Sequence, residues 1–212
     1  MAELDVVVVA SGEGPAVTLP AARTIVAADG GLDRARALGL EVDVVVGDLD
    51  SVTPDALTAA ESSGARIVRH PQAKDATDLE LALDEAVALG ASRVLVVASA
   101  EGRLDHLLSS LLLLTAERYA RLELDALAGD ALVHVVRGER RLEGSAGEVL
   151  TLVPVGGPAT GVTTEGLEYP LAGETLEPGT TRGVSNVFIG TDARVAVASG
   201  VLLAIRPEGA TA

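Results

Sequence analysis

Short apolar runs alternate with amphipathic stretches in roughly the first 120 residues. Continuous β-branched runs at 6–10, 24–28 and 42–46 are typical of strands buried on both faces of a parallel sheet. Two further strands are predicted at 65–68 and 94–98. Strands that alternate with helices predict a layered α/β domain with helices on both faces, whose functional loops follow the carboxyl ends of the strands.

The segments between these runs have the spacing of helices. Leucine and alanine recur at roughly helical intervals over 32–40. A helix over 54–62 has Thr53 as its predicted N-cap. Two longer helices are predicted over 77–89 and 104–119.

The pattern changes after about Gly129, where no helical period remains. Short apolar runs between glycine and proline turns predict a small antiparallel β domain. The expected strands are 131–136, 149–153, 186–189, 194–198 and 201–205, and the expected turns are 156–158, 178–179 and 199–200. We therefore divide the chain into a domain of residues 1–127 and a domain of residues 128–212.

The net charge and the hydropathy of the chain limit the classes of partner that it can bind. The 212 residues hold 16 lysines and arginines against 31 aspartates and glutamates, and this net charge of −15 repels a phosphate polyanion unless a metal cation stands between them. We therefore expect no nucleic-acid partner. No apolar run approaches the ~20 residues that span a bilayer. The first dozen residues lack the basic opening of a secretory signal, so we expect no membrane partner and a cytoplasmic location.

Three residue types are rare or absent. The chain has no cysteine, which excludes disulfides, thiolate zinc sites and cysteine nucleophiles. Its aromatic residues are Tyr119, Tyr169 and Phe188, so a flat ligand has few stacking partners. Lys74 is the one lysine among 16 basic residues. It is either a chance survivor on a solvated loop or a residue that the chemistry requires.

Four polar clusters follow predicted strands. In the first, at 28–31, two glycines let the backbone approach a ligand, and Asp29 stands near a helix that it could also simply cap. In the second, Asp48 and Asp50 flank one residue. In an extended segment both carboxylates point the same way and can share a hard cation. The alternative is that Asp50 or Ser51 only caps the next helix.

The third cluster, at 74–78, sets Lys74 beside two carboxylates at a helix entry. The ammonium group suits a phosphate, and Asp75 and Asp78 could complete a magnesium site. The alternative is a helix capped by Thr77, with local salt bridges.

The fourth cluster offers Arg103 for phosphate oxygens, the carboxylate of Asp105 and the imidazole of His106. Taken singly, each cluster is ambiguous. Together, four polar clusters at successive strand ends of an apolar domain describe a site for a magnesium nucleotide.

In their order along the chain, the four clusters resemble the signature of the thiamine pyrophosphokinase family. The matching motifs are Asp29-Gly30-Gly31, Gly47-Asp48-x-Asp50-Ser51, Lys74-Asp75-x-Thr77-Asp78 and Gly102-Arg103-x-Asp105-His106. Two later segments, 166–171 and 183–186, are similar to the thiamine-binding segments of that family. The resemblance implies a Rossmann-like α/β catalytic domain followed by an antiparallel β-sandwich domain. The implied reaction moves the diphosphoryl group of ATP to the hydroxyl of thiamine.

The resemblance also implies a homodimer, in which thiamine lies where the catalytic domain of one subunit meets the β domain of the other. It assigns magnesium to Asp48, Asp50 and Asp78. The catalytic residues it implies are Asp29, Asp48, Asp50, Lys74, Asp78, Arg103 and Asp105. On the ATP side it implies Gly30, Gly31, Ser51, Lys74, Asp75, Thr77, Arg103 and His106. On the thiamine side it implies Tyr169, Ser185 and Asn186, with Tyr169 where some members carry a stacking tryptophan.

Two residues depart from the family pattern. Glu101 stands where a glycine is usual and adds negative charge near the phosphates, and Val187 replaces the usual acidic residue after the Ser-Asn pair. Other functions also stay open. The chain could be a diphosphokinase for another hydroxymethyl heterocycle such as a pterin, or a non-catalytic sensor of nucleotide or thiamine diphosphate. For the transfer itself, Asp105 and Asp29 both remain candidates to accept the hydroxyl proton.

Overall fold

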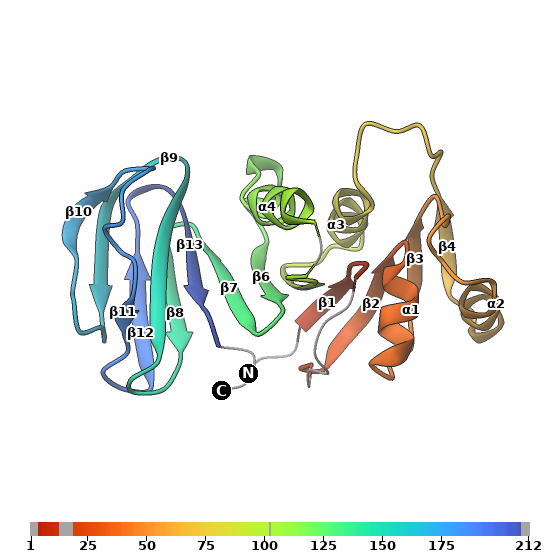
Figure 1. Cartoon of the computed structure of the whole chain (residues 1–212), viewed down its shortest axis with the longest axis horizontal. Coiled ribbons are helices and arrows are strands. Elements are labelled where there is room, and N and C mark those ends of the chain that lie inside the picture. Colours follow the sequence, from red (N-terminus) through yellow and green to blue (C-terminus); the bar gives the residue numbers. More distant parts are fainter. Residues whose placement is uncertain (1–3, 13–18, 102, 209–212) are drawn as a thin grey trace. The chain divides into compact units, whose positions relative to one another are not determined.

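The computed structural model describes residues 4–12, 19–101 and 103–208, which form two compact units (Figure 1). The first unit comprises the described residues up to Leu113 together with Arg121–Gly129. The second comprises Leu114–Ala120 and the described residues from Asp130 onward. No helix in these described ranges is long and apolar enough to cross a bilayer.

The first unit is built on parallel strands in the order β4-β3-β2-β1-β5-β6. The strands are β1 Leu4–Val9, β2 Ala22–Ala28, β3 Val44–Gly47, β4 Arg66–Arg69, β5 Arg93–Ala98 and β6 Glu123–Ala128. The valines of β1, β3 and β5 are buried, because both faces of these strands are covered. The predicted α/β class is confirmed.

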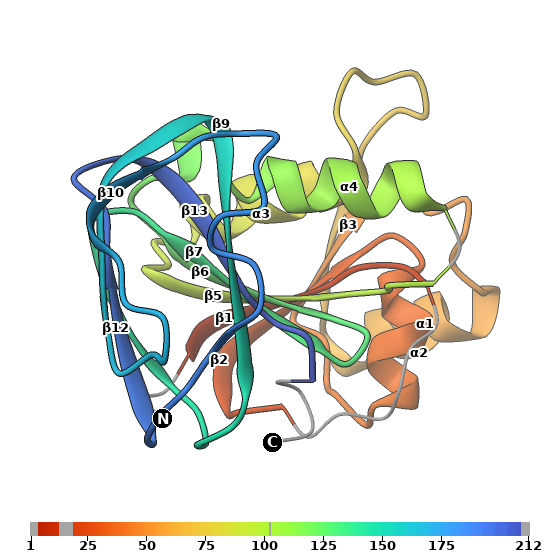
Figure 2. The same ribbon diagram turned by 60° about the vertical axis from the view of Figure 1, so that its left-hand side comes forward.

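Helices lie on both faces of these strands. Figure 2 shows α3 and α4 on one side and α1 and α2 on the other. The helices are α1 Gly31–Ala37, α2 Pro54–Ser63, α3 Asp78–Ala88 and α4 Leu104–Leu113. Thr53 caps α2 by accepting from the Ala56 N–H, and Thr77 caps α3 by accepting from the Glu80 N–H. Both are the expected N-caps.

The fourth helix is shorter than the sequence predicts. It ends at Leu113, and a separate 3₁₀ turn, η1 Glu117–Tyr119, follows. Arg137 donates to the carbonyls of Thr115 and Ala116, which in a continuous helix would accept backbone N–H groups further along the chain. The predicted helix over 104–119 was therefore wrong in its last turns.

The second unit is antiparallel, with the strand order β7-β13-β9-β12-β8 and with β10 and β11 paired to β9. Its strands are β7 Ala131–Val136, β8 Glu139–Glu143, β9 Val149–Glu165, β10 Ala172–Leu176, β11 Asn186–Val187, β12 Asp192–Ala196 and β13 Ser199–Arg206. The expected antiparallel β class is confirmed, and Pro178–Gly179 is a turn as predicted.

The long strand β9 overturns one predicted turn. Gly156 and Gly157 lie within it at positive φ (76° and 155°), and the register with β13 shifts beside them. Glycine accepts these torsion angles, so the strand bends and passes from β13 to β12 as partner without a turn. The turn expected at 199–200 was also wrong, because Ser199 and Gly200 begin β13.

Candidate active site

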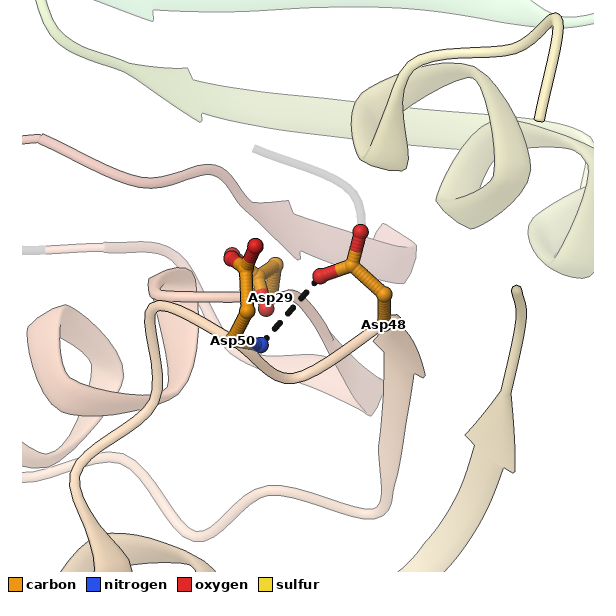
Figure 3. A group of neighbouring side chains, drawn as sticks. All are labelled: Asp29, Asp48 and Asp50. Carbon is orange, nitrogen blue, oxygen red and sulfur yellow. Dashed lines mark hydrogen bonds between the residues drawn. The ribbon is translucent and has the colours of Figure 1, made fainter. Parts of the chain in front are cut away.

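Three aspartates gather at the carboxyl ends of two neighbouring parallel strands (Figure 3). Asp29 follows β2, and Asp48 and Asp50 follow β3. Each offers a carboxylate oxygen, and these oxygens lie within 4.8 Å of one another. Crowded carboxylates repel one another without a counter-cation, and carboxylate oxygens are the ligands that magnesium prefers. The cluster therefore fits a hard divalent cation.

The loop that carries Asp48 and Asp50 is turned rather than extended. Leu49 between them has a φ of 64°, which costs a residue with a side chain about 1 kcal/mol. Its side chain is buried, which holds the turn in place. The turn lets the Asp50 N–H donate to Asp48 Oδ1 over 3.2 Å. The expected extended segment was therefore wrong, although the carboxylates still approach one another.

Asp29 is the buried member of the cluster, with 5% of its surface exposed. Its Oδ1 has no hydrogen-bond partner among the residues that the structure describes. A buried carboxylate oxygen without a partner is costly, unless a cation or another ligand binds it. This unpartnered oxygen is a second observation, independent of the clustering, that fits a metal.

The capping alternatives for these aspartates were wrong. The N-cap of α1 is Gly30, not Asp29, and the N-cap of α2 is Thr53. Asp50 instead accepts hydrogen bonds from Ser51 Oγ at 2.9 Å and from Gln72 Nε2 at 2.8 Å. Gln72 is a site residue that the sequence reasoning missed, because it stands alone on a loop outside every motif.

Lys74 ties the second and third motifs together. Its Nζ lies 3.2 Å from Asp48 Oδ2 and 2.6 Å from Asp78 Oδ1. Burial lowers the pKa of Lys74, but the hydrogen bonds to Asp78 and Asp48 outweigh burial, and the net pKa is above the usual value. The pKa of Asp48 is lowered, first by the backbone N–H of Asp50 and then by Lys74. Lys74 is therefore a fixed cation beside the acidic cluster.

Gly47 opens the second motif, but the sequence reasoning assigned it no role. It ends β3 with a φ of 151°, and a Cβ there would lie 3.0 Å from Asp29 Cβ and 3.0 Å from Asp78 Oδ1. Asp29 and Asp78 thus approach the same backbone position from two elements. The glycine directly before the acidic pair was the signal that could have predicted this role.

The fourth motif is more exposed. Arg103 donates to both carboxylate oxygens of Asp105, and the two side chains are 70% and 64% exposed. The Arg103 guanidinium lowers the pKa of Asp105 to about 2. His106 is exposed beside them, and Gly102 lies outside the described residues. Asp105 is thus paired with Arg103.

The remaining ATP-side residues divide between loops and helix starts. Asp75 is exposed on the loop before α3, and Thr77 caps that helix. Gly30 faces Ser51, because a Cβ added to Gly30 would lie 3.4 Å from the Cβ of Ser51. Gly31 is required for packing, because a Cβ there would lie 2.0 Å from the Val9 carbonyl oxygen.

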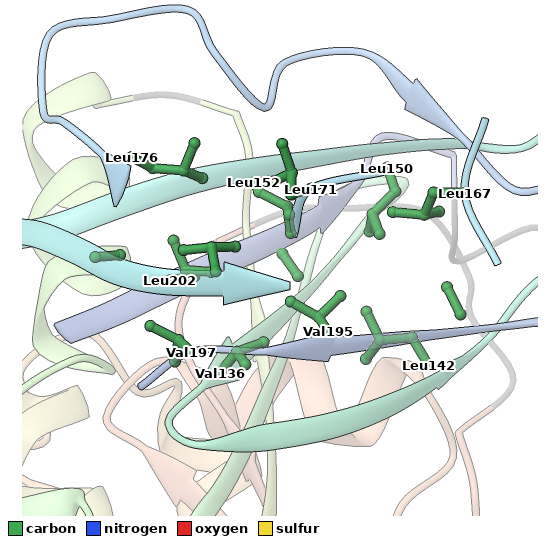
Figure 4. Packing of buried hydrophobic residues seen from close by; sticks show 14 of the residues in the cluster. Val136, Leu142, Leu150, Leu152, Leu167, Leu171, Leu176, Val195, Val197 and Leu202 are labelled. Atoms are coloured by element: carbon green, nitrogen blue, oxygen red, sulfur yellow. The ribbon is translucent and has the colours of Figure 1, made fainter. Parts of the chain in front are cut away.

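The second unit has a cavity of about 450 Å³. Its lining residues are Tyr169, Leu171, Thr181, Arg182, Gly183, Val184, Ser185 and Asn186. Leu171 also belongs to the hydrophobic core of this unit (Figure 4), so the cavity borders a packed interior. The three residues predicted for the thiamine side therefore lie together.

Asn186 is part of the cavity wall but is almost fully buried, with 4% of its surface exposed. Its Nδ2 donates to the Tyr169 carbonyl at 2.7 Å, and its Oδ1 accepts from the N–H groups of Tyr169 at 3.0 Å and Val187 at 2.9 Å. Ser185 has a φ of 57°, and its N–H donates to Thr151 Oγ1 at 3.0 Å. The Asn186 amide therefore holds the backbone that carries Tyr169, a role that its position in the motif did not predict.

Two family descriptions match the chain. Residues 17–124 match the catalytic domain of thiamin pyrophosphokinase, and residues 133–202 match its vitamin B1 binding domain. The chain belongs to the thiamin pyrophosphokinase family. The resemblance predicted from the sequence motifs is confirmed, and the two matched regions correspond to the α/β and antiparallel units.

Curated relatives carry the same name at modest identity. The chain is 27% identical over 159 residues to thiamine pyrophosphokinase 1 of Oryza sativa subsp. japonica, covering 68% of this chain but only 58% of that relative. It is 26% identical over 184 residues to thiamine pyrophosphokinase of Bacillus subtilis, covering 83% of this chain and 85% of that protein.

Solved structures of the family share the fold. The crystal structure of thiamine pyrophosphokinase from Bacillus subtilis has a TM-score of 0.81 at 23% identity, covering 95% of this chain and 98% of that one. Thiamin pyrophosphokinase from Candida albicans has a TM-score of 0.76 at 18% identity, covering 96% and 89%. The predicted combination of an α/β unit with a β-sandwich is thus the family fold.

Proposed function

We propose that the chain transfers the diphosphoryl group of ATP to the hydroxyl of thiamine, giving thiamine diphosphate and AMP. The observation that carries this proposal is the set of carboxylates from Asp29, Asp48 and Asp50, with Lys74 beside them, inside the region that matches the family's catalytic domain. In this proposal residues 1–127 bind ATP and residues 128–212 bind thiamine.

Asp48, Asp50 and Asp78 are the proposed magnesium ligands. Asp48 and Asp50 lie in the carboxylate cluster with Asp29, whose buried unpartnered Oδ1 adds Asp29 to the ligands, and Asp78 is linked to that cluster through Lys74. A bound magnesium ion neutralises charge on the phosphate oxygens and orients ATP. Lys74 adds a compact positive charge beside the phosphates, and Arg103 offers a second cation. These groups supply positioning and charge neutralisation, which is most of what transfer at phosphorus requires.

The transfer needs no covalent enzyme intermediate. The thiamine hydroxyl oxygen bonds to the β-phosphorus of ATP, the bond from that phosphorus to the α-phosphate oxygen breaks, and AMP leaves. The hydroxyl proton passes to a carboxylate. Asp29 and Asp105 both remain candidates for the acceptor, because Arg103 engages Asp105 and lowers its pKa to about 2, while Asp29 Oδ1 is assigned to magnesium in this proposal.

The thiamine side of the proposal is the cavity of the second unit. Tyr169 is 55% exposed at its wall, and its ring can stack on a flat cationic heterocycle. Ser185 lines the same cavity. Val187 stands at the place of the usual acidic residue, and its side chain offers no charge to a thiazolium. We propose that stacking on Tyr169 supplies much of the affinity.

We propose a homodimer whose active sites combine both subunits, located in the cytoplasm, where ATP is abundant. The surface of α4 supports the dimer, because Leu104, Leu108 and Leu112 are 76%, 54% and 46% exposed on it. An apolar helix face of this kind is typical of a protein interface. Light scattering should give twice the 21.4 kDa chain mass, and Leu108→Glu should give the monomer.

The function is tested by incubating the protein with ATP, magnesium and thiamine, and by following AMP and thiamine diphosphate by chromatography. We expect both products in equal amounts, and none with a chelator or with Asp50→Asn, while Asp55→Asn on the exposed start of α2 keeps full activity. AMP formed with a hydroxymethylpterin but not with thiamine would favour the pterin alternative. Bound thiamine diphosphate without turnover would favour the sensor alternative.

A further inference from the structure

The loop between β4 and α3 reaches the acidic cluster at two points. Lys74 on this loop contacts Asp48 and Asp78. Gln72, two residues earlier, donates from its Nε2 to Asp50 Oδ2 over 2.8 Å. The Lys74 N–H also donates to the Gln72 carbonyl at 3.1 Å, so the backbone couples the two contacts. A neutral amide and an ammonium group therefore approach the cluster from one short loop.

The composition of the chain sets these two residues apart. Gln72 is the single glutamine of the sequence, as Lys74 is its single lysine. The only other residue with a side-chain amide is Asn186, which holds the backbone of Tyr169 at the cavity of the second unit. Both side-chain amides of the sequence thus contact residues of the two proposed sites. This distribution favours a functional role for Gln72 over a chance position.

The carboxylate of Asp50 is exposed and accepts from neutral side chains. Ser51 Oγ donates to its Oδ1 at 2.9 Å, and Gln72 Nε2 donates to its Oδ2. Ser51 is the next residue in the chain, whereas Gln72 lies 22 residues away and ties Asp50 to a second loop. An exposed carboxylate without such a tie can adopt several rotamers, and fixing one of them costs conformational entropy. Gln72 therefore fixes the direction of the Asp50 carboxylate.

The two contacts from this loop differ in charge. Lys74 pairs with Asp48 as a cation, so part of the negative charge of Asp48 is already balanced. Gln72 is neutral, so it orients Asp50 and leaves the full negative charge of that carboxylate for another cation. Hydrogen bonds that orient a ligating carboxylate commonly change metal affinity by about 10- to 100-fold.

We propose that Gln72 positions Asp50 for a divalent cation, as a neutral donor that fixes the carboxylate without competing for its charge. This inference rests on the proposed function, because it takes the cation to be the magnesium ion that Asp29, Asp48 and Asp50 fit. Gln72 is a positioning residue, since it acts on the cation through Asp50. Its loss should therefore change the affinity for the cation and not the stability of the fold.

The test measures the binding of Mn²⁺, which takes the same oxygen ligands as magnesium, through the electron paramagnetic resonance signal of the free ion. In Gln72→Met the side chain keeps its length and loses the donor, so the Kd should rise about 10-fold. In Gln72→Lys the donor stays but its charge pairs with Asp50, so the Kd should rise further. Ala73→Lys adds the same charge at the next, exposed residue and should change the Kd by less than about 3-fold, because an exposed charge without a fixed pair contributes little.

Thermal unfolding without metal separates positioning from damage to the fold. Gln72 is exposed, so the melting temperature of Gln72→Met should lie within about 2 °C of the wild-type value. Gln72→Lys should be as stable as the wild type or more stable, because the added charge relieves repulsion within the cluster. Wild-type Mn²⁺ affinity in Gln72→Met would overturn the inference. Equal affinities in Gln72→Lys and Ala73→Lys, or a weaker affinity that comes with a lowered melting temperature, would also overturn it.

The titration contains no nucleotide and no thiamine, so it is independent of turnover. If the wild type does not bind Mn²⁺, the proposed metal site and the inference fail together. If the proteins rank as expected but the wild type forms no thiamine diphosphate, the proposed function fails and the positioning role of Gln72 stands. In an active enzyme, saturating magnesium should restore kcat of Gln72→Met to within about 3-fold of the wild type, because only cation binding is weakened.

Discussion

The side-chain amide of Asn186 hydrogen-bonds both backbone groups of Tyr169, its N–H and its carbonyl. Its amide donates to the Tyr169 carbonyl at 2.7 Å and accepts from the Tyr169 N–H at 3.0 Å, across 17 residues of sequence. The three hydrogen bonds of the buried amide thus all end on backbone groups of the protein. We therefore predict that Asn186 acts on a ligand of the cavity through Tyr169.

Asn186→Asp tests this positioning role. The carboxylate cannot donate to the Tyr169 carbonyl, and it faces that oxygen with a negative charge. We expect KM for thiamine to rise by about 10-fold while kcat changes by less than about 3-fold, because a binding wall is displaced and the phosphate chemistry is not. Thr180→Val is the control. It removes a hydroxyl that donates to the backbone carbonyl of Glu177, three residues earlier.

A spectroscopic readout separates positioning from general damage. The chain has no tryptophan and two tyrosines, so Tyr119→Phe leaves Tyr169 as the single tyrosine fluorophore. In that background thiamine should quench the fluorescence, and Asn186→Asp should shift the quenching to higher thiamine concentration. Equal quenching curves in the two proteins would refute the role assigned to Asn186.

Asp29→Asn is expected to affect metal binding and stability in opposite directions. The change removes the charge from a buried oxygen that has no partner in the described chain, so the metal-free protein should be as stable as the wild type or more stable. The rise in melting temperature on adding magnesium should be lost. Asp55→Asn should change neither quantity, and a full magnesium response in Asp29→Asn would contradict the assigned ligand.

Lys74→Arg keeps the charge and should still lose activity. The ammonium group fits between Asp48 and Asp78 at 3.2 and 2.6 Å, and the larger planar guanidinium cannot replace it there without moving one of them. Steady-state rates should fall at least about 10-fold, as for a displaced charge at a reacting phosphate. Arg69→Lys, the reverse change at the exposed end of β4, is the control. Wild-type kinetics in Lys74→Arg would make the single lysine a chance survivor.

Asp5 should make the stability of the folded protein depend on pH in the acidic range. Its carboxylate accepts from Ser92 Oγ, from the Ser92 N–H and from the Arg93 N–H, and these bonds lower its pKa from 3.8 to about 2. A lowered folded-state pKa stabilises the protein fully above pH 3.8, and the effect is lost as the pH falls toward 2. The difference in melting temperature between wild type and Asp5→Asn should therefore be constant near neutral pH and disappear near pH 2. A difference that persists unchanged at pH 2 would contradict this role.

The fold could be predicted where hydrophobic pattern decides structure. The valine runs of β1, β3 and β5 identified a buried parallel sheet because both faces of such strands are apolar. Strands β6, β8 and β10 were missed, because their charged or polar positions break the apolar runs. The course of β9 depends on partners far along the chain, so its glycines looked like a turn.

The site could be predicted where the edge rule for parallel strands applies. Asp29, Asp48 and Asp50 meet because β2 and β3 are neighbours that end at the same edge. The left-handed backbone of Leu49 has no local sequence signal, since leucine rarely adopts it. The bonds from Asn186 to Tyr169 depend on tertiary structure, and no motif spacing contains them.

The central claim is that the diphosphoryl group of ATP passes to thiamine. It is tested most directly by incubating the protein with magnesium, thiamine and ATP that carries ³²P at the β-position, and by following where the label goes. If the diphosphoryl group moves whole, the label appears in thiamine diphosphate and the AMP is unlabelled, in a single step without thiamine monophosphate. Label in ADP together with unlabelled thiamine monophosphate would show transfer of the γ-phosphoryl group alone, and would contradict the account.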